Sequence, residues 1–330
     1  MELTRQATGS GLDTRSSVMR ICSLLPGATE VVAALGLADR LVGISHECDF
    51  PLEVRKAAVL VRATVESDHL TSAEIDHRVK ETLKAGEPLY RLDEASLREA
   101  RPDLVITQDL CQVCAVTPEG LQRAMASLPQ PPQLLVLNPT SLDDVLADIE
   151  RIGIATDRGP EARAYAQALR TRLQSIEECV KTVASRPKVL CLEWLGPFYI
   201  AGHWVPQMVA LAGGVDPLGA PDAPSRTATW DDLVAVAPDI LVLMPCGFSA
   251  DRTVHEVTRL ALPSEHAWQD LPAVREGRVY AVDASSYFSR PGPRLVDGVA
   301  ILASLCHPSL FGEPHVEDVR RVDLLNLRRR

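Results

Sequence analysis

The sequence predicts an α/β protein with two Rossmann-like lobes, each built on a mostly parallel sheet, joined by a long rigid helix. Short apolar runs rich in β-branched residues recur along the chain, each followed by a Gly, Pro or polar break and then by a helical pattern. Such alternation is typical of parallel sheets that are covered by helices on both faces. The length of 330 residues suffices for about two domains. The gap from Leu137 to Val189 is too long for an ordinary crossover and has the spacing of helices.

Seven apolar runs are predicted to be strands. They cover residues 19–24, 41–44, 104–107, 134–137, 189–192, 240–243 and 279–282. Four lie before the long gap and three after it, which indicates two separate sheets.

Two helices are predicted within the long gap. The first covers 142–154 with Ser141 as its N-cap, and after a break at 157–160 the second covers 161–184 with apolar residues at helical spacing. The second helix would be about 36 Å long, enough to cross between two domains. The predicted organisation is a disordered leader (1–18), an N-terminal lobe (19–140), connecting helices (141–185), a C-terminal lobe (186–312) and a tail (313–330). The segment 61–92 is expected to be an insertion that covers one edge of the first lobe.

Composition and charge exclude several classes of protein. The net charge of −10 argues against a nucleic-acid partner, because phosphate binding requires a basic face. No run reaches the ~18 apolar residues of a membrane span, and the first 17 residues lack the apolar core of a secretory signal. The expected location is therefore cytoplasmic, and the eight cysteines are expected to be reduced.

Aromatic residues gather after the predicted strands, where ligands of open parallel sheets bind. The chain has five Phe, five Tyr and four Trp, and eight of them follow strands: Phe50, Trp194, Phe198, Tyr199, Trp204, Phe248, Tyr287 and Phe288. This placement favours a cleft for a large, flat, partly apolar ligand, the alternative being ordinary packing at the sheet ends. His203 lies among these aromatics, and Arg290 could either clamp a carboxylate, amide or phosphate of the ligand or fix the last helix by a salt bridge.

The stretch 21–51, ICSLLPGATEVVAALGLADRLVGISHECDFP, resembles the opening of the cobalamin-binding proteins of ABC importers. These proteins share the class III periplasmic-binding-protein fold with siderophore and heme binders. The resemblance continues through 101–106, 202–214 and 230–242, and it closes at YFSRPGPR (287–294), so it covers both lobes.

The resemblance implies a shallow cleft between two lobes that a rigid helix joins, with little hinge closure. It also implies that aromatic residues hold the corrin ring, and by position these would be Phe50, Trp204, Tyr287 and Phe288. Members of this family dock on a transporter through one exposed acidic residue per lobe, for which Glu30 and Asp222 lie in suitable regions.

Thiol and imidazole groups also follow the predicted strands. A candidate metal set comprises His46, Cys48, Cys111, Cys114, Glu193 and Cys246. Cys111-x-x-Cys114 puts two thiols within reach of one metal, and a thiolate-rich set favours zinc or an iron–sulfur cluster. With a corrinoid bound, His46 or His203, or a thiolate, could instead be the axial ligand to cobalt. The alternative is that the cysteines are small buried residues and that His46 bonds a backbone carbonyl.

Three functions follow from these patterns. The first is a protein that binds cobalamin, or a related corrinoid or tetrapyrrole, without turnover, as a carrier, storage or delivery protein with an ABC permease or a cobalamin-dependent enzyme as its partner. The second is an enzyme or metal carrier that uses zinc or an iron–sulfur cluster held by the Cys/His set. The third is an ABC importer component whose signal segment precedes the present start.

Overall fold

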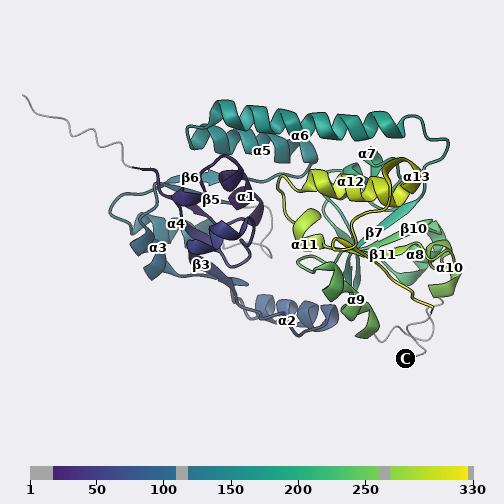
Figure 1. Ribbon diagram of the computed structural model, residues 1–330. Coiled ribbons are helices and arrows are strands. Elements are labelled where there is room, and N and C mark those ends of the chain that lie inside the picture. The colour runs from purple at the N-terminus through teal and green to yellow at the C-terminus, as the bar shows by residue number, and fades with distance from the viewer. Residues whose placement is uncertain (1–17, 109–117, 260–267, 326–330) are drawn as a thin grey trace, which may run out of the picture.

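The computed structural model describes residues 18–108, 118–259 and 268–325, which form two α/β lobes beneath one long helix (Figure 1). Each lobe contains a six-stranded sheet. The two-lobe α/β fold predicted from the alternating pattern is therefore confirmed.

The N-terminal lobe has a mostly parallel sheet in the order β4-β3-β2-β1-β5-β6, in which only β4 is antiparallel to its neighbour. Its strands are β1 (Ile21–Ser23), β2 (Leu41–Ser45), β3 (Ala58–Ala63), β4 (Tyr90–Leu92), β5 (Leu104–Thr107) and β6 (Gln133–Val136). Its helices are α1 (Pro26–Ala34), α2 (Ser72–Lys84), α3 (Glu94–Ala100) and α4 (Pro118–Ala126), with short 3-10 turns at Ala38–Arg40 and Leu52–Lys56.

The C-terminal lobe has the sheet order β12-β11-β10-β7-β8-β9, with a parallel centre and antiparallel edges. Its strands are β7 (Val189–Leu195), β8 (Phe198–Ile200), β9 (Arg226–Thr227), β10 (Ile240–Leu243), β11 (Val279–Val282) and β12 (Val319–Arg321). Its helices are α7 (Val205–Leu211), α8 (Trp230–Val236), α9 (Ala250–Arg259), α10 (Pro272–Arg275), α11 (Ala284–Tyr287), α12 (Leu295–Cys306) and α13 (Pro308–Phe311), with a 3-10 turn at Trp268–Asp270.

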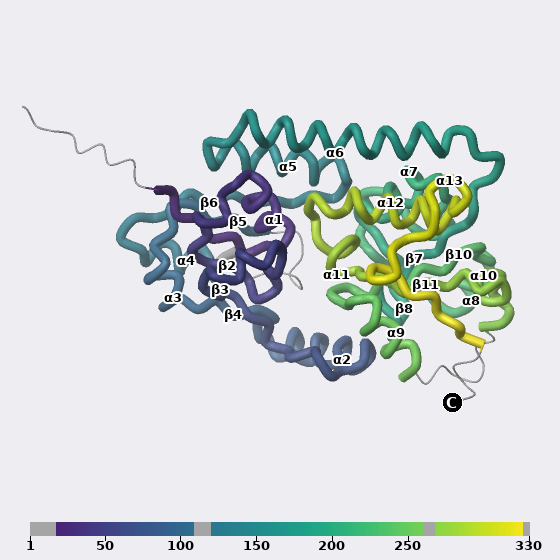
Figure 2. Tube along the Cα trace, in the orientation of Figure 1, coloured from purple at the N-terminus to yellow at the C-terminus, as the bar shows by residue number. Residues whose placement is uncertain are grey.

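Two helices join the lobes across one flank of the molecule (Figure 2). α5 (Leu142–Ala155) begins at Ser141, whose side chain accepts a hydrogen bond from the Asp144 amide as the sequence predicts. α6 (Gly159–Val180) begins with Pro160 in its first turn, and its 22 residues span about 33 Å. It starts two residues before the predicted helix and ends four residues earlier.

One cluster of buried apolar side chains runs through α5 and α6 from lobe to lobe. It includes Ile21 and Ile106 of the first sheet, Ile149 of α5, Leu169 of α6 and Val242 of the second sheet. Because a packed interior resists deformation, this shared core ties the two lobes to the same pair of helices.

All seven predicted strands are present, and the sequence pattern missed β3, β4, β8, β9 and β12. All five lie outside the centres of the sheets, and each has at least one antiparallel neighbour. β12 lies in the stretch predicted to be a tail: it pairs with β11, and Val322 and Leu324 after it are buried, so apolar contacts hold residues 319–324 on the lobe. Within the described residues no helix is both long and apolar enough to cross a membrane.

Candidate functional site

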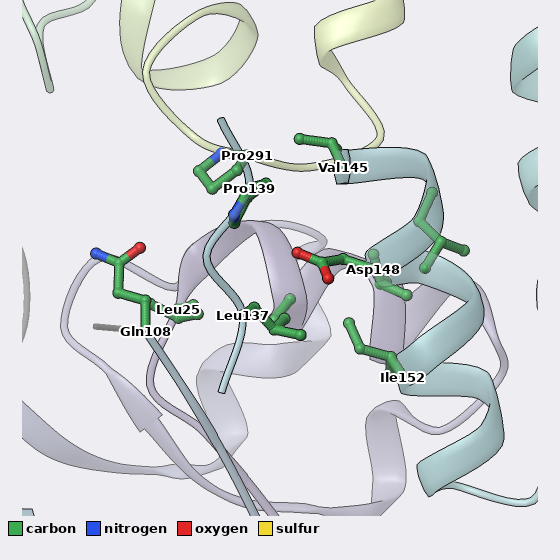
Figure 3. Close-up of a pocket in the computed structure, with 11 residues that line it drawn as sticks. Leu25, Gln108, Leu137, Pro139, Val145, Asp148, Ile152 and Pro291 are labelled. Atoms are coloured by element: carbon green, nitrogen blue, oxygen red, sulfur yellow. The ribbon is translucent and has the colours of Figure 1, made fainter. Parts of the chain in front are cut away.

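The carboxyl ends of three strands of the first sheet converge on a small cavity against the second lobe (Figure 3). Leu25, Gln108 and Leu137 follow β1, β5 and β6, and Pro291 from the loop before α12 lies opposite them. The cavity measures about 10 Å³, which is room for roughly one water molecule. The two lobes are therefore in close contact at this point.

Asp148 of α5 contributes the carboxylate that Figure 3 shows beside this cavity. Burial raises the pKa of Asp148, while the Arg151 guanidinium, 2.7 Å away, acts in the opposite direction. The cavity thus combines an apolar wall with one buried acid.

The backbones of the two lobes meet at two glycines. Gly27, at the start of α1, lies against Pro291 and Gly292 so tightly that a Cβ on Gly27 would collide with the Pro291 carbonyl oxygen. A Cβ on Gly292 would lie 2.8 Å from the Gly27 Cα. Only glycine fits at either position, because two backbones meet there without side chains between them.

A buried ion pair lies beside the glycine contact. Arg294, in the loop that enters α12, donates to both carboxylate oxygens of Glu30 at 2.6 and 3.0 Å. The Glu30 side chain is 5% exposed, and burial raises its pKa although the hydrogen bonds and charge of Arg294 act against that shift. Glu30 is therefore not available for docking on a transporter, which corrects the expectation drawn from the resemblance.

The same guanidinium also contacts two aromatic rings. Its central carbon lies 4.3 Å from the ring centroid of Phe50 and 5.8 Å from that of Tyr287. Phe50 keeps 47% of its surface exposed. Burial and the hydrogen bond from Tyr287 to Asp318 raise the pKa of the Tyr287 phenol to about 12, so it stays neutral.

A second ion pair joins the lobes next to the first. Arg290 donates to the two oxygens of Asp49 at 2.5 and 3.4 Å. Burial alone would raise the pKa of Asp49, but the hydrogen bond and charge of Arg290 outweigh it and hold this pKa below its usual value. Of the two roles that the sequence left open for Arg290, the structure shows a salt bridge, and it is made to the opposite lobe.

This second pair gives a pH-dependent prediction. We expect Asp49→Asn to lower the free energy of unfolding at pH 7 by up to about 1 kcal/mol, the range of partly exposed pairs. A carboxyl whose pKa is depressed on folding stabilises the protein above its unfolded pKa, and that contribution disappears as the pH falls through the folded pKa. The difference between the variant and the native protein, measured by urea unfolding, should therefore begin to shrink near pH 4, the unfolded pKa of an aspartate, and vanish only below the depressed folded pKa. Glu178→Gln, at an exposed pair with Lys181, is the control and should show little effect at either pH.

Two of the predicted ring contacts lie in the interior of the C-terminal lobe. Trp204 is 6% exposed and donates from Nε1 to the backbone oxygen of Phe288 at 2.8 Å, and Phe288 is 2% exposed. The reason is that Trp204 forms the N-cap of α7, which packs on α12 and α6. In this structure both residues pack in the apolar core. Of the four predicted ring contacts, only Phe50 and Tyr287 lie at the boundary of the lobes.

The remaining predicted aromatics all lie in the C-terminal lobe, where they are either packed in its core or half-buried on β7 and β8. Phe198 packs with Trp230 and Trp268 in a separate apolar cluster, and Tyr199 is half-buried on β8 opposite Thr227. Phe248 is 2% exposed and meets the half-buried Trp194 edge to face, with centroids 5.6 Å apart.

His203 has an unusual backbone and an unusual side chain. Its φ is +52°, and among the described residues its buried Nδ1 has no hydrogen-bond partner. Burial lowers its pKa, which favours the neutral imidazole that coordinates metals. His203 as an axial ligand to cobalt stays a prediction.

The predicted metal set is not assembled by the residues that the structure describes, among which no three His, Cys, Asp or Glu side chains form a metal-holding group. Cys48 is 3% exposed and lies 3.1 Å from the Thr29 hydroxyl, and burial raises its pKa to about 11, which keeps the thiol protonated. His46 places Nδ1 3.2 Å from the Val61 carbonyl oxygen. Glu193 and Cys246 are linked through the backbone, where the Cys246 amide donates to the Glu193 carbonyl. Cys111 and Cys114 lie outside the described residues.

The sequence analysis did not identify Arg294 and Asp49 as members of the two ion pairs between the lobes, and it gave Glu30 a different role. A signal existed for Glu30, which is a charged residue inside the apolar run of α1, and such a residue is normally paired when buried. Arg294 stands four residues after Arg290 in a Pro/Gly-rich loop, a spacing that carries no pattern of its own.

Comparison with known proteins places these features in context. The profile of a family described as periplasmic binding protein matches residues 21–285. The chain is 24% identical over 318 residues to the uncharacterized ABC transporter substrate-binding lipoprotein YvrC of Bacillus subtilis, covering 93% of this chain and 86% of that protein. It is also 24% identical over 293 residues to the vitamin B12-binding protein of Vibrio cholerae, covering 85% and 86% respectively.

A solved structure has a similar fold. The periplasmic heme-binding protein RhuT from Roseiflexus sp. RS-1, in its apo form, aligns with a TM-score of 0.64 at 21% identity and covers 87% of this chain and 97% of its own. At that identity the likeness is one of fold.

Proposed function

The chain belongs to the periplasmic binding protein family, and from that premise we propose that it binds cobalamin or a related tetrapyrrole between its two lobes without turnover. The resemblance in the sequence and the matching fold are the basis for placing the ligand between the two lobes. Support for the ligand comes from the vitamin B12-binding relative, with which the chain shares most of its length.

The observation that carries the proposal is the half-exposed Phe50 beside two arginines of the opposite lobe. Phe50 offers a ring face to a flat ligand, while Arg290 and Arg294 provide fixed donors at the same boundary. A ligand with an apolar plane and oxygen-rich side groups matches this combination. Corrin carries amides around its plane, and heme carries two carboxylates.

Heme is the second candidate, and the two guanidinium groups favour it. Arginine binds carboxylates through paired hydrogen bonds, as the bonds to Glu30 and Asp49 already demonstrate. A heme carboxylate could replace Asp49 at Arg290, since Asp49 is the more exposed of the two acids.

The proposed partner is an ABC permease, and the basis is the relative named as an ABC transporter substrate-binding lipoprotein. That name favours the importer alternative over the cytoplasmic location expected from the first residues. A zinc or iron–sulfur enzyme has no comparable support, because the described residues assemble no metal group.

Titration with hydroxocobalamin and with hemin tests the proposal. We expect one of the two to bind with one-to-one stoichiometry and a shift in its absorption bands, with a Kd at or below the micromolar range, which corresponds to about −8 kcal/mol. Saturation by neither compound at 100 times that concentration would exclude a tetrapyrrole carrier.

The role of Phe50 gives a sharper prediction. Phe50→Ala should weaken binding of the tetrapyrrole by about 2 kcal/mol, or roughly 30-fold, because a stacked aromatic face is removed from the site. Isothermal calorimetry measures this change. Leu52→Ala is the matched control, since Leu52 lies two residues after Phe50, at the start of the 3-10 turn, and is 74% exposed; an equal loss in both variants would remove Phe50 from the site.

A further inference from the structure

An insertion from the first lobe crosses to the second lobe on the flank opposite α5 and α6. Residues 64–89, here called the strap, leave the sheet after β3 and return to it at β4, with α2 between. The Thr64 amide donates to the Leu89 oxygen and its hydroxyl to the Pro88 oxygen, which closes the neck of the strap. Figures 1 and 2 show α2 below the boundary of the two lobes, next to α9.

The strap is fastened at Ser72, the first residue of α2. Both the backbone amide and the hydroxyl of Ser72 donate to one carboxylate oxygen of Glu256 in α9, at 2.7 and 2.5 Å. The indole Nε1 of Trp194, near the end of β7, donates to the Ser72 backbone oxygen at 3.1 Å. Ser72 and Glu256 are 0% and 3% exposed, so these bonds are shielded from water.

Two arginines of α9 extend this fastening. Arg252 donates to the Ser67 oxygen at 2.6 Å, and Arg259 donates to the His69 oxygen at 3.3 Å. The Arg252 guanidinium lies 3.7 Å from the centroid of Phe248, whose ring in turn meets Trp194. We call Trp194, Arg252 and Glu256 the latch.

The strap has little apolar attachment besides the latch. Of the 13 residues of α2 only Ser72 and Ile75 are buried, and its other face is charged and exposed. α2 has its own capping box, made by Thr71 and Glu74, so its first turn is satisfied within the strap. Segments held by a few hydrogen bonds and little buried apolar surface open locally at lower free energy than the cores beside them.

The latch also lies at one edge of the second sheet. Trp194 lies near the carboxyl end of β7 and α9 follows β10, so both belong to the carboxyl edge of that sheet, and their hydrogen bonds to Ser72 bring this edge against the insertion of the first lobe. α5 and α6 close one flank of that boundary permanently, since the chain runs through them (Figure 1). The strap closes the opposite flank by hydrogen bonds that can break.

We propose that the strap is a gate: the latch opens to admit the ligand to the boundary of the two lobes and closes again behind it. This inference rests on the proposed function for the identity of the ligand. It assigns Trp194 and Phe248, which the sequence predicted to contact the ligand, to the seat of the strap in the closed state.

A disulfide can hold the strap shut. A Cβ at Gly196 would lie 3.2 Å from the Ala73 Cβ, close to the 3.5–4.5 Å separation found in disulfides. In the double variant Ala73→Cys with Gly196→Cys, we expect oxidation to slow the association of cyanocobalamin and of hemin at least 100-fold in stopped-flow measurements. Reduction should restore the rate. The single variant Ala73→Cys under the same oxidant is the control, and equal rates in the oxidised and reduced double variant would overturn the gate.

A second measurement tests the latch without any ligand. Hydrogen exchange should be at least tenfold faster in the strap than in the central strands of either lobe. Glu256→Ala, and Trp194→Phe, which keeps a ring and removes only the N–H donor, should accelerate the strap further while leaving the strands unchanged. A strap that exchanges as slowly as the strands would overturn the gate.

The two experiments separate the possible failures. If neither tetrapyrrole binds the reduced protein, the proposed ligand is wrong, and hydrogen exchange still decides whether the strap opens. If a tetrapyrrole binds at the same rate with the strap locked, the proposed function stands and the gate does not.

Discussion

Arg294→Ala is expected to lower the free energy of unfolding by about 3–5 kcal/mol, the usual cost of removing one partner of a buried ion pair. The variant leaves the Glu30 carboxylate, 5% exposed, without its two hydrogen bonds at the boundary of the lobes. Because burial already raises the pKa of Glu30, the loss should shrink as the pH falls through that raised pKa and the carboxyl becomes neutral. Denaturant unfolding at several pH values measures both effects.

A matched pair provides the control. Arg172 and Asp297 join α6 to α12 at 2.6 Å, but their side chains are 50% and 40% exposed, so Arg172→Ala should cost less than about 1 kcal/mol. Replacing both members of the buried pair, Glu30→Leu with Arg294→Met, should recover much of the lost stability because no charge is left unpaired. A loss in Arg294→Ala no larger than in Arg172→Ala would contradict the role assigned to this pair.

Trp204→Ala is expected to destabilise the protein by a similar amount, about 3–5 kcal/mol, as large aromatic side chains do when they are removed from a core. Trp204 is 6% exposed, packs in the apolar cluster shared by both lobes, and bonds the Phe288 oxygen. Trp204→Phe keeps most of the apolar volume and should lose only part of this stability. Calorimetric or denaturant unfolding measures the change.

This prediction also distinguishes two roles for Trp204. If the residue supports the fold, any loss of ligand binding in Trp204→Ala should follow the fraction of unfolded protein and be reversed at lower temperature. A variant that keeps its stability to within about 1 kcal/mol yet no longer binds the tetrapyrrole would show that Trp204 contacts the ligand, as the resemblance implies.

The sequence predicts the centre of this fold better than its edges, for a physical reason. Strands buried on both faces, such as β1 and β10, are continuous apolar runs and are readily recognised. β8 and β9 have three and two residues, pair antiparallel and have only one buried residue between them, so no periodicity marks them. The helices of the connector were found because a cap and a regular apolar spacing coincide there.

The candidate site was predictable only in part. Phe50, Tyr287 and Arg290 follow strands or lie close after one, and all three lie at the boundary of the lobes. Trp204 also follows a strand, yet the turn after β8 directs its side chain into the core. No local sequence pattern distinguishes a residue that enters the core from one that lies at the boundary of the lobes. The latch joins Ser72 to a residue 184 positions away, and such pairing is invisible in a single sequence.

The glycine contact between the lobes has a mechanical consequence. Two backbones that meet without intervening side chains cannot move closer there, so the contact would act as the fulcrum of any relative tilt of the lobes. The fulcrum lies near α1 and α12, whereas α2 and α9 lie on the far side of the molecule (Figure 1). A tilt of one lobe about Gly27 and Gly292 would therefore displace Ser72 relative to Glu256 by more than it displaces Glu30 relative to Arg294, which lie beside the glycines.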